Sequence, residues 1–135
     1  MTTNLARALL DTSVFIAHES GRPLNTAALP DEALVSVITI AELHAGVLAA
    51  RDTQTRSRRL ATLDAVRALE PLPVDTAAAT HWAALRVRLA EEGRRAKVND
   101  LWIAAIAAAN DLPVVTQNDD FDPIEAVGGP LAIHV

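Results

Sequence analysis

The sequence predicts an α/β fold in which helices cover both faces of a short, mostly parallel β-sheet. Short apolar segments bounded by turn residues alternate with longer segments whose apolar side chains recur at helical spacing. Parallel strands require crossover connections, and helices usually provide them. The chain has 135 residues, of which 50% are hydrophobic, which suits one compact domain with its own core. We therefore expect a single domain over residues 1–135.

The N-terminal part predicts a strand, a helix and a second strand. The apolar run Leu5–Leu10 ends at Asp11. Thr12 and Ser13 then offer hydroxyl groups that are typical N-caps for a following helix. After a loop marked by glycine and prolines, Ala33–Ile38 is short, apolar and bounded by turn residues, which indicates the second strand.

Several helices are expected in the middle of the chain. One begins at Thr39, and residues 56–69 continue with leucine and valine at helical spacing. Asp75 can cap a long helix over Thr76–Glu92. The segment Asn99–Asn110 is apolar on almost every side and rich in alanine, which indicates a helix buried between other elements.

The C-terminal part predicts a buried strand at Pro113–Thr116, an acidic loop at Gln117–Pro123 and an edge strand at Leu131–Val135. In sheets of this kind, ligands bind outside the carboxyl ends of the strands. We therefore look for functional residues at that edge.

Acidic residues stand at those carboxyl ends. The set comprises Asp11, Glu42, Asp100 and the pair Asp119 and Asp120. Each has a structural explanation by itself, such as a capping box of Thr39 with Glu42, or a favourable anion in the first helical turn for Asp100. Capping does not, however, require acids from distant parts of the chain to converge on one edge. Their convergence therefore predicts a functional site.

A cluster of carboxylates calls for a cation. Two carboxylates about 4 Å apart repel by roughly 4 kcal/mol at an effective dielectric constant near 20. With no cysteine in the chain, the ligands are oxygen donors, which suits Mg²⁺ first and Mn²⁺ as a substitute. Such an ion would activate a water molecule and stabilise charge on a phosphoryl group, which is the chemistry of phosphodiester hydrolysis. An aspartyl-phosphate phosphatase fits less well, because Ser13 stands where its second acid would be.

Composition indicates where the protein is located and how its charge is distributed. The absence of cysteine excludes disulfides, and no apolar stretch is long enough to span a bilayer, so we expect a cytoplasmic protein without membrane contact. The net charge is −5, but all basic residues other than Arg7 and Arg22 lie in two segments, 51–67 and 86–97. Local charge steers a polyanion. The clusters favour contact with phosphate only weakly, since solvated helix faces explain them equally well.

Four segments carry a family resemblance: Leu-Leu-Asp11-Thr-Ser, Val-Ile-Thr-Ile-Ala-Glu42-Leu with Gly46 following, Asn99-Asp100-Leu-Trp-Ile-Ala-Ala, and Val-Val-Thr116-Gln-Asn-Asp-Asp120-Phe. In this order they resemble the PIN-domain ribonucleases, and among them the VapC-type toxins of bacterial toxin–antitoxin pairs. The resemblance covers the whole chain and implies a PIN-like three-layer α/β fold.

The resemblance also implies a Mg²⁺-dependent endoribonuclease that cuts structured RNA such as tRNA or rRNA, often forms a homodimer, and is inhibited by a cognate VapB-type antitoxin. It implies catalytic and metal-binding roles for Asp11, Glu42, Asp100 and Asp120. Family members often carry acids at the second and fourth positions after the threonine, where this chain has Asn118 and Asp120. Asp120 therefore takes the fourth role, with Asp119 in reserve.

Two alternatives remain open at the level of sequence. The first is a catalytically silent PIN-like module that binds RNA or a protein partner. The second is a metal nuclease that acts on DNA, because carboxylates do not report whether the sugar carries a 2′-hydroxyl group.

Overall fold

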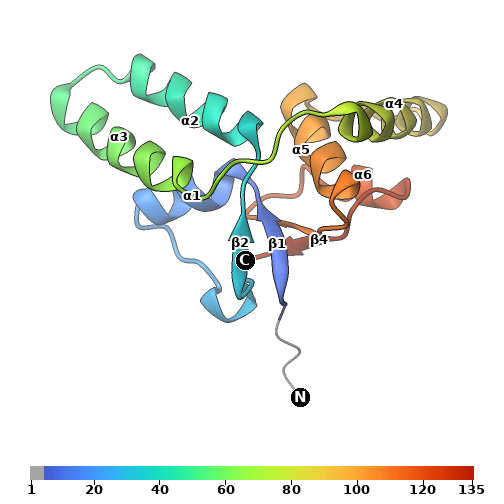
Figure 1. Cartoon of the computed structure of the whole chain (residues 1–135), viewed down its shortest axis with the longest axis horizontal. Coiled ribbons are helices and arrows are strands. Elements are labelled where there is room, and N and C mark those ends of the chain that lie inside the picture. Colours follow the sequence, from blue (N-terminus) through green and yellow to red (C-terminus); the bar gives the residue numbers. More distant parts are fainter. Residues whose placement is uncertain (1–4) are drawn as a thin grey trace.

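A computed structural model of the chain describes residues 5–135 and confirms the α/β fold with a parallel sheet (Figure 1). Residues 1–4 of the expected single domain lie outside the described residues. The strands are β1 (Arg7–Leu10), β2 (Glu32–Leu34), β3 (Val114–Thr116) and β4 (Ala132–His134). Their order across the sheet is β2-β1-β3-β4, and every neighbouring pair is parallel.

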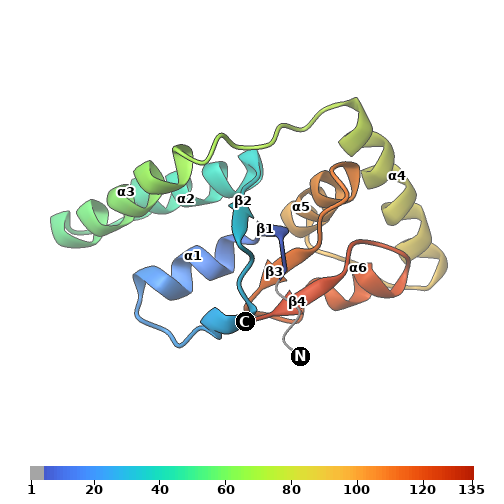
Figure 2. The same ribbon diagram turned by 60° about the horizontal axis from the view of Figure 1, so that its bottom comes forward.

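Helices make the crossover connections. They are α1 (Thr12–Glu19), α2 (Val37–Ala49), α3 (Thr53–Arg67), α4 (Thr76–Glu91), α5 (Val98–Ala109) and α6 (Asp122–Ala126), with one 3-10 turn, η1 (Thr26–Ala28). In both views α1 and the α2–α3 hairpin lie on one side of the sheet, and α4, α5 and α6 lie on the other (Figures 1 and 2). No helix within residues 5–135 combines the length and apolar character that crossing a membrane requires.

Successive strand side chains pack into different cores on the two faces of the sheet. Leu9 and Val114 join the core formed with α4, α5 and α6. Their neighbours Ala8, Leu10 and Val115 belong to a second core with α1. Side chains alternate between faces along a strand, so a sheet that is buried on both faces must be apolar at every position. The short, uninterrupted apolar runs of the sequence have this origin.

Helix α2 begins earlier than the sequence predicts. Strand β2 ends at Leu34, and the expected strand Ala33–Ile38 therefore runs into the helix. The N-cap is Ser36, whose Oγ accepts a hydrogen bond of 3.3 Å from the backbone N–H of Thr39. A capping box of Thr39 with Glu42, which was the structural alternative for Glu42, does not form, because Thr39 lies inside the first helical turn.

Two other local expectations also fail. Asp11, rather than Thr12 or Ser13, occupies the N-cap position of α1, and its side chain makes no capping hydrogen bond. The expected acidic loop Gln117–Pro123 contains the start of α6, whose second residue is Pro123. Proline is well tolerated in the first turn of a helix because that turn needs no N–H from it.

The predicted cap of α4 is confirmed, and it supports a stability test. The carboxylate of Asp75 accepts a hydrogen bond of 2.9 Å from the N–H of Ala78. We expect Asp75→Ala to lower the free energy of unfolding by about 1 kcal/mol, because one N–H at the helix start loses its acceptor. Urea denaturation measures this difference. Asp31→Ala is the matched control, since the exposed Asp31 side chain has no hydrogen bond or ion pair within residues 5–135, and an equal loss in both variants would contradict the capping role.

Candidate functional site

The carboxyl ends of the two central strands meet the first turns of three helices at one edge of the sheet. Asp11 directly follows β1, and its N–H donates to the carbonyl oxygen of Val115 in β3. Asp100 lies in the first turn of α5, and Glu42 lies in α2. The charges of Asp11, Asp120 and Glu42 all act on Asp100. The four acids predicted from the sequence are therefore brought to one place.

Hydroxyl donors hold the carboxylate of Asp11. The residue is only 3% exposed. Its Oδ2 accepts hydrogen bonds from Ser13 Oγ at 2.7 Å and from Thr116 Oγ1 at 3.1 Å. Ser13 Oγ in turn accepts from the N–H of Gln117 at 3.0 Å, which ties the loop after β3 to the same carboxylate. The Asp11 side chain is thus held by these hydroxyl groups and is not used as a helix cap.

A chain of buried hydroxyl groups leads to Glu42. Thr12 Oγ1 donates to Glu42 Oε1 at 2.7 Å and lies 2.9 Å from Thr39 Oγ1. A hydroxyl group has one proton, so Thr12, which gives its proton to Glu42, must accept one from Thr39. Thr12 is 6% exposed and Thr39 is fully buried. The order of donation is therefore Thr39 to Thr12 to Glu42.

Asp100 is the acid whose environment favours its charged form least. It is 9% exposed, and its Oδ2 is buried with no hydrogen-bond partner among the described residues. Burial, followed by the charges of Asp11, Asp120 and Glu42, raises the pKa of Asp100 to about 7. A helix N-terminus alone would favour the anion, so the first-turn position does not explain this carboxyl group. An ionised Asp100 here lacks the partner that a buried charge needs.

Lys97 pairs with the fourth acid. Its Nζ donates to Asp120 Oδ2 at 3.0 Å, and this hydrogen bond raises the pKa of Lys97. Asn118 Oδ1 accepts from the N–H of Asp120 at 3.0 Å, so Asn118 shapes the turn that presents Asp120. The reserve candidate Asp119 lies instead against His134, with 3.5 Å between Asp119 Oδ1 and His134 Nε2.

The donor set fits a divalent cation. All four acids offer oxygen ligands, and a cation would satisfy the unpartnered oxygen of Asp100 and offset the mutual repulsion. No three of them bring one oxygen each within 4.8 Å of one another; within residues 5–135 only the exposed Asp119, Asp122 and His134 form such a group. Because Mg²⁺ keeps several waters and takes one or two carboxylates directly, wider spacing of the remaining acids suits it. The unpartnered buried oxygen of Asp100 is an observation in favour of the buried acids, and the exposed group has no such atom.

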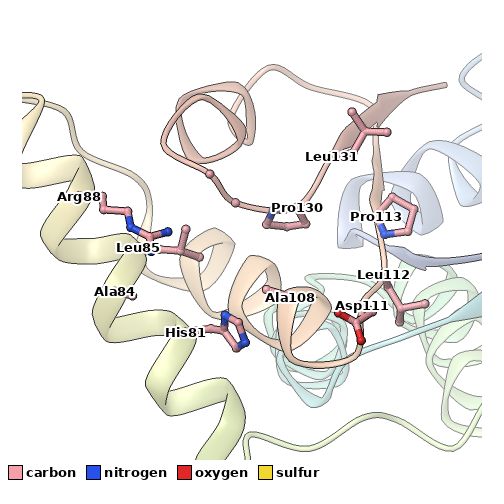
Figure 3. Close-up of a pocket in the computed structure, with 12 residues that line it drawn as sticks. His81, Ala84, Leu85, Arg88, Ala108, Asp111, Leu112, Pro113, Pro130 and Leu131 are labelled. Atoms are coloured by element: carbon pink, nitrogen blue, oxygen red, sulfur yellow. The ribbon is translucent and has the colours of Figure 1, made fainter.

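A cavity of about 550 Å³ lies at the opposite end of the sheet (Figure 3). Pro113 and Leu131, which precede β3 and β4, line it together with His81 and Arg88 of α4. It therefore opens at the amino ends of the strands. The carboxylates lie at their carboxyl ends, so this cavity is separate from them.

Sequence reasoning did not identify Thr12, Thr39 and Lys97 as parts of the site. In the sequence, Lys97 is one member of a basic segment, and the two threonines fit helix caps. One signal was available for Thr39, which lies three residues before Glu42 and hence on the same side of a helix. The partners across the sheet edge had no signal in the local sequence.

Comparison with known proteins gives consistent similarities. The family model described as "PIN domain" matches residues 8–126. The chain is 54% identical over all 135 residues to Ribonuclease VapC5 of Mycobacterium tuberculosis, and both chains are covered completely. It is 31% identical over 130 residues to the tRNA(fMet)-specific endonuclease VapC of Shigella flexneri, covering 93% of this chain and 95% of that protein.

Solved structures agree with this similarity. The crystal structure of VapBC-5 from Mycobacterium tuberculosis, described as a member of the VapBC family of toxin-antitoxin systems, contains a chain that matches with a TM-score of 0.89 and 52% identity. The match covers 96% of this chain and 99% of that chain. The similarity therefore includes the three-dimensional fold as well as the sequence.

The raised pKa of Asp100 predicts an unusual dependence of stability on pH in metal-free protein. The folded state keeps the Asp100 proton up to pH about 7, whereas the unfolded chain releases it near the ordinary value of 3.8. Between these values the folded state binds more protons, so this group's contribution to the free energy of unfolding falls as the pH rises. We expect Asp100→Asn to remove that fall. Urea denaturation with a chelator across this range measures it, with the exposed Asp111→Asn as control; identical pH profiles for Asp100→Asn and the unaltered chain would rule out the assignment.

The hydroxyl chain predicts that Thr39 affects metal binding through Thr12. Thr39→Val keeps the volume but removes the proton that Thr12 accepts, so the support for Glu42 weakens. We expect roughly tenfold weaker Mg²⁺ binding, as for other residues that orient ligands, and near-normal binding in Thr39→Ser. Isothermal titration measures the affinity. If Thr39→Val is less stable but binds Mg²⁺ normally, Thr39 has a packing role only.

Proposed function

This chain belongs to the PIN-domain family, as a VapC ribonuclease toxin of a VapBC toxin–antitoxin system, and from that premise we propose that it cuts structured RNA with Mg²⁺ held by Asp11, Glu42, Asp100 and Asp120. The observation that carries the proposal is Asp100, a buried acid with an unpartnered oxygen and a pKa raised to about 7 beside three other carboxylates. Such perturbed groups are concentrated at functional sites.

Each acid has a distinct part in the proposed site. Asp11 is held in position by Ser13 and Thr116, so it could bind a cation without reorganisation. Asp100 would give up its proton when it holds the cation. Glu42, oriented by Thr12, would hold the ion or accept a proton from water.

When bound, Mg²⁺ supplies a Lewis acid that lowers the pKa of water and neutralises charge on the phosphate. The remaining work belongs to the protein. Asp120 is more exposed than Asp11 and is already paired with Lys97, so it stands at the rim of the site. Lys97 is thereby held where a phosphate oxygen would approach, and it offsets part of the negative charge that would otherwise repel RNA.

The names of the similar proteins support a proposed substrate and a proposed protein partner. The Shigella flexneri relative is named for cleavage of a tRNA, and we extend structured RNA, either tRNA or rRNA, to this chain. The structural match to a VapBC toxin-antitoxin system supports a VapB antitoxin as the protein partner. A homodimer and a cytoplasmic location complete the proposal, and both rest on family resemblance.

The test is cleavage of total cellular RNA by purified, antitoxin-free protein with and without Mg²⁺, with Asp100→Asn run in parallel. We expect discrete fragments only with Mg²⁺ and at least a hundredfold loss in Asp100→Asn, because removing one acid disrupts both charge and coordination. The exposed Asp111→Asn should cut normally. Cleavage by Asp100→Asn at the normal rate would refute the site, and cleavage of matched single-stranded DNA at the same rate as RNA would assign the site to a nuclease without sugar preference.

A further inference from the structure

The two basic segments of the chain differ in what their arginines contact. In the segment 51–67, four of the five arginines have partners within the protein. The contacts are Arg56 to the Ala50 carbonyl at 2.9 Å, Arg59 to the Gly46 carbonyl at 2.6 Å, Arg58 to Glu19 at 3.9 Å and Arg67 to Asp64 at 3.8 Å. This segment therefore uses its charge largely to hold α3 against its neighbours.

The arginines of the second segment are not used in this way. Within residues 5–135, the side chains of Arg86, Arg88, Arg94 and Arg95 make no ion pair and no hydrogen bond, and all four are exposed. In a chain with a net charge of −5, unpaired and adjacent cations are not needed for solubility. Their charge is available to an external anion.

Three of these arginines line one groove between α4 and α5. Its volume is about 620 Å³, and Arg86, Arg94 and Arg95 surround an apolar floor that includes Leu89 and Leu101. Arg88 lies on the other side of α4, where it lines the cavity of Figure 3. The groove thus combines positive walls with an apolar floor, which suits a phosphate backbone and its bases.

An aromatic stack holds one of the arginines in place. The rings of Trp82 and Trp102 lie 5.0 Å apart at an interplanar angle of 18°, and the Arg86 guanidinium lies 5.6 Å from the centroid of the Trp82 ring. A cation over a tryptophan ring loses little further freedom on binding an anion.

The groove is continuous with the carboxylate site along the chain. Arg94, Arg95 and Ala96 line the groove, and the next residue, Lys97, is bonded to Asp120 at 3.0 Å. The loop that carries Arg94 and Arg95 therefore leads from the groove to the residue that contacts Asp120.

We propose that the α4–α5 groove binds the phosphates of a single-stranded RNA segment next to the cleavage point, with Arg86, Arg94 and Arg95 as its contacts. This inference rests on the proposed function, since it assigns that function a substrate path. Arg94 and Arg95 bind phosphate directly, and the Trp82 stack positions Arg86 for a third contact. The groove contributes affinity and register rather than bond cleavage.

The test measures binding of fluorescently labelled tRNA in EDTA, over a series of salt concentrations, with a gel to verify that the RNA stays intact. Each phosphate contact in single-stranded nucleic acid contributes about 0.7 to the slope of log K against log salt. We expect Arg94→Gln/Arg95→Gln to make this slope shallower by about 1.4. The control is Arg51→Gln/Arg88→Gln, which removes the same charge from outside the groove and should retain the slope of the unaltered chain.

Tryptophan fluorescence gives a second readout. Trp82 and Trp102 are the two tryptophans of the chain and form the stack beside the groove. Saturating RNA should therefore change their emission in the unaltered chain and in the control. Equal slopes in the two double variants, or unchanged emission at saturation, would overturn the proposal. So would a change from dimer to monomer on sedimentation of Arg94→Gln/Arg95→Gln, because the groove would then be a contact between two copies.

The binding assay and the cleavage assay can fail separately. If the unaltered chain shows no metal-dependent cleavage but the expected slope difference is found, the proposed nuclease activity is refuted. The groove then remains an RNA-binding surface. Normal cleavage with no slope difference would keep the nuclease and remove the groove.

Discussion

The burial of carboxyl groups at the carboxyl ends of β1 and β3 is the constraint on which the rest of the site depends. Asp11 and Asp100 are 3% and 9% exposed, and both lie where the central strands of the sheet end. Burial of an unpaired carboxylate costs more free energy than the whole stability of a typical domain. Each buried carboxyl group must therefore have hydrogen-bond donors, a proton or a cation. Asp11 finds two hydroxyl donors, whereas Asp100 Oδ2 finds none within the described residues. The difference marks Asp100 as the position that needs a cation most.

The same constraint explains why an apolar core contains so many hydroxyl groups. Thr12, Thr39 and Thr116 are all buried, and an unpaired hydroxyl group in such a place is costly. Each of them donates to an acid or to the group that supports an acid. Polar groups buried in this fold are therefore concentrated around the carboxylates, and the rest of the sheet is packed by aliphatic side chains. The same hydrogen bonds therefore stabilise the fold and pre-organise the site.

The sequence predicts the architecture and the positions of the acids, but not the contacts between them. Apolar runs that end in an acid are readable because parallel strands all present their carboxyl ends at one edge. The start of α2 was not readable, because Val37, Ile38 and Ile40 are β-branched and favour a strand locally. The helix begins at the local N-cap Ser36, and Thr39 in its first turn contacts Thr12, which lies 27 positions away. The pairing of Lys97 with Asp120, 23 positions apart, is likewise invisible to local patterns.

The placement of cations resolves an electrostatic conflict in this chain. A site with four carboxylates repels the phosphate that it is proposed to cut, and the net charge of −5 adds to that repulsion. Most arginines in the segment 51–67 contact the protein itself, whereas those of the segment 86–95 are unpaired within the described residues and form a group of cations that could attract RNA. Lys97, which follows them in the chain, is paired with Asp120. In the proposed site, a divalent ion at Asp100 would lower this repulsion further. Binding of the ion and binding of RNA must then favour each other to the same extent, because coupling between two ligands is reciprocal.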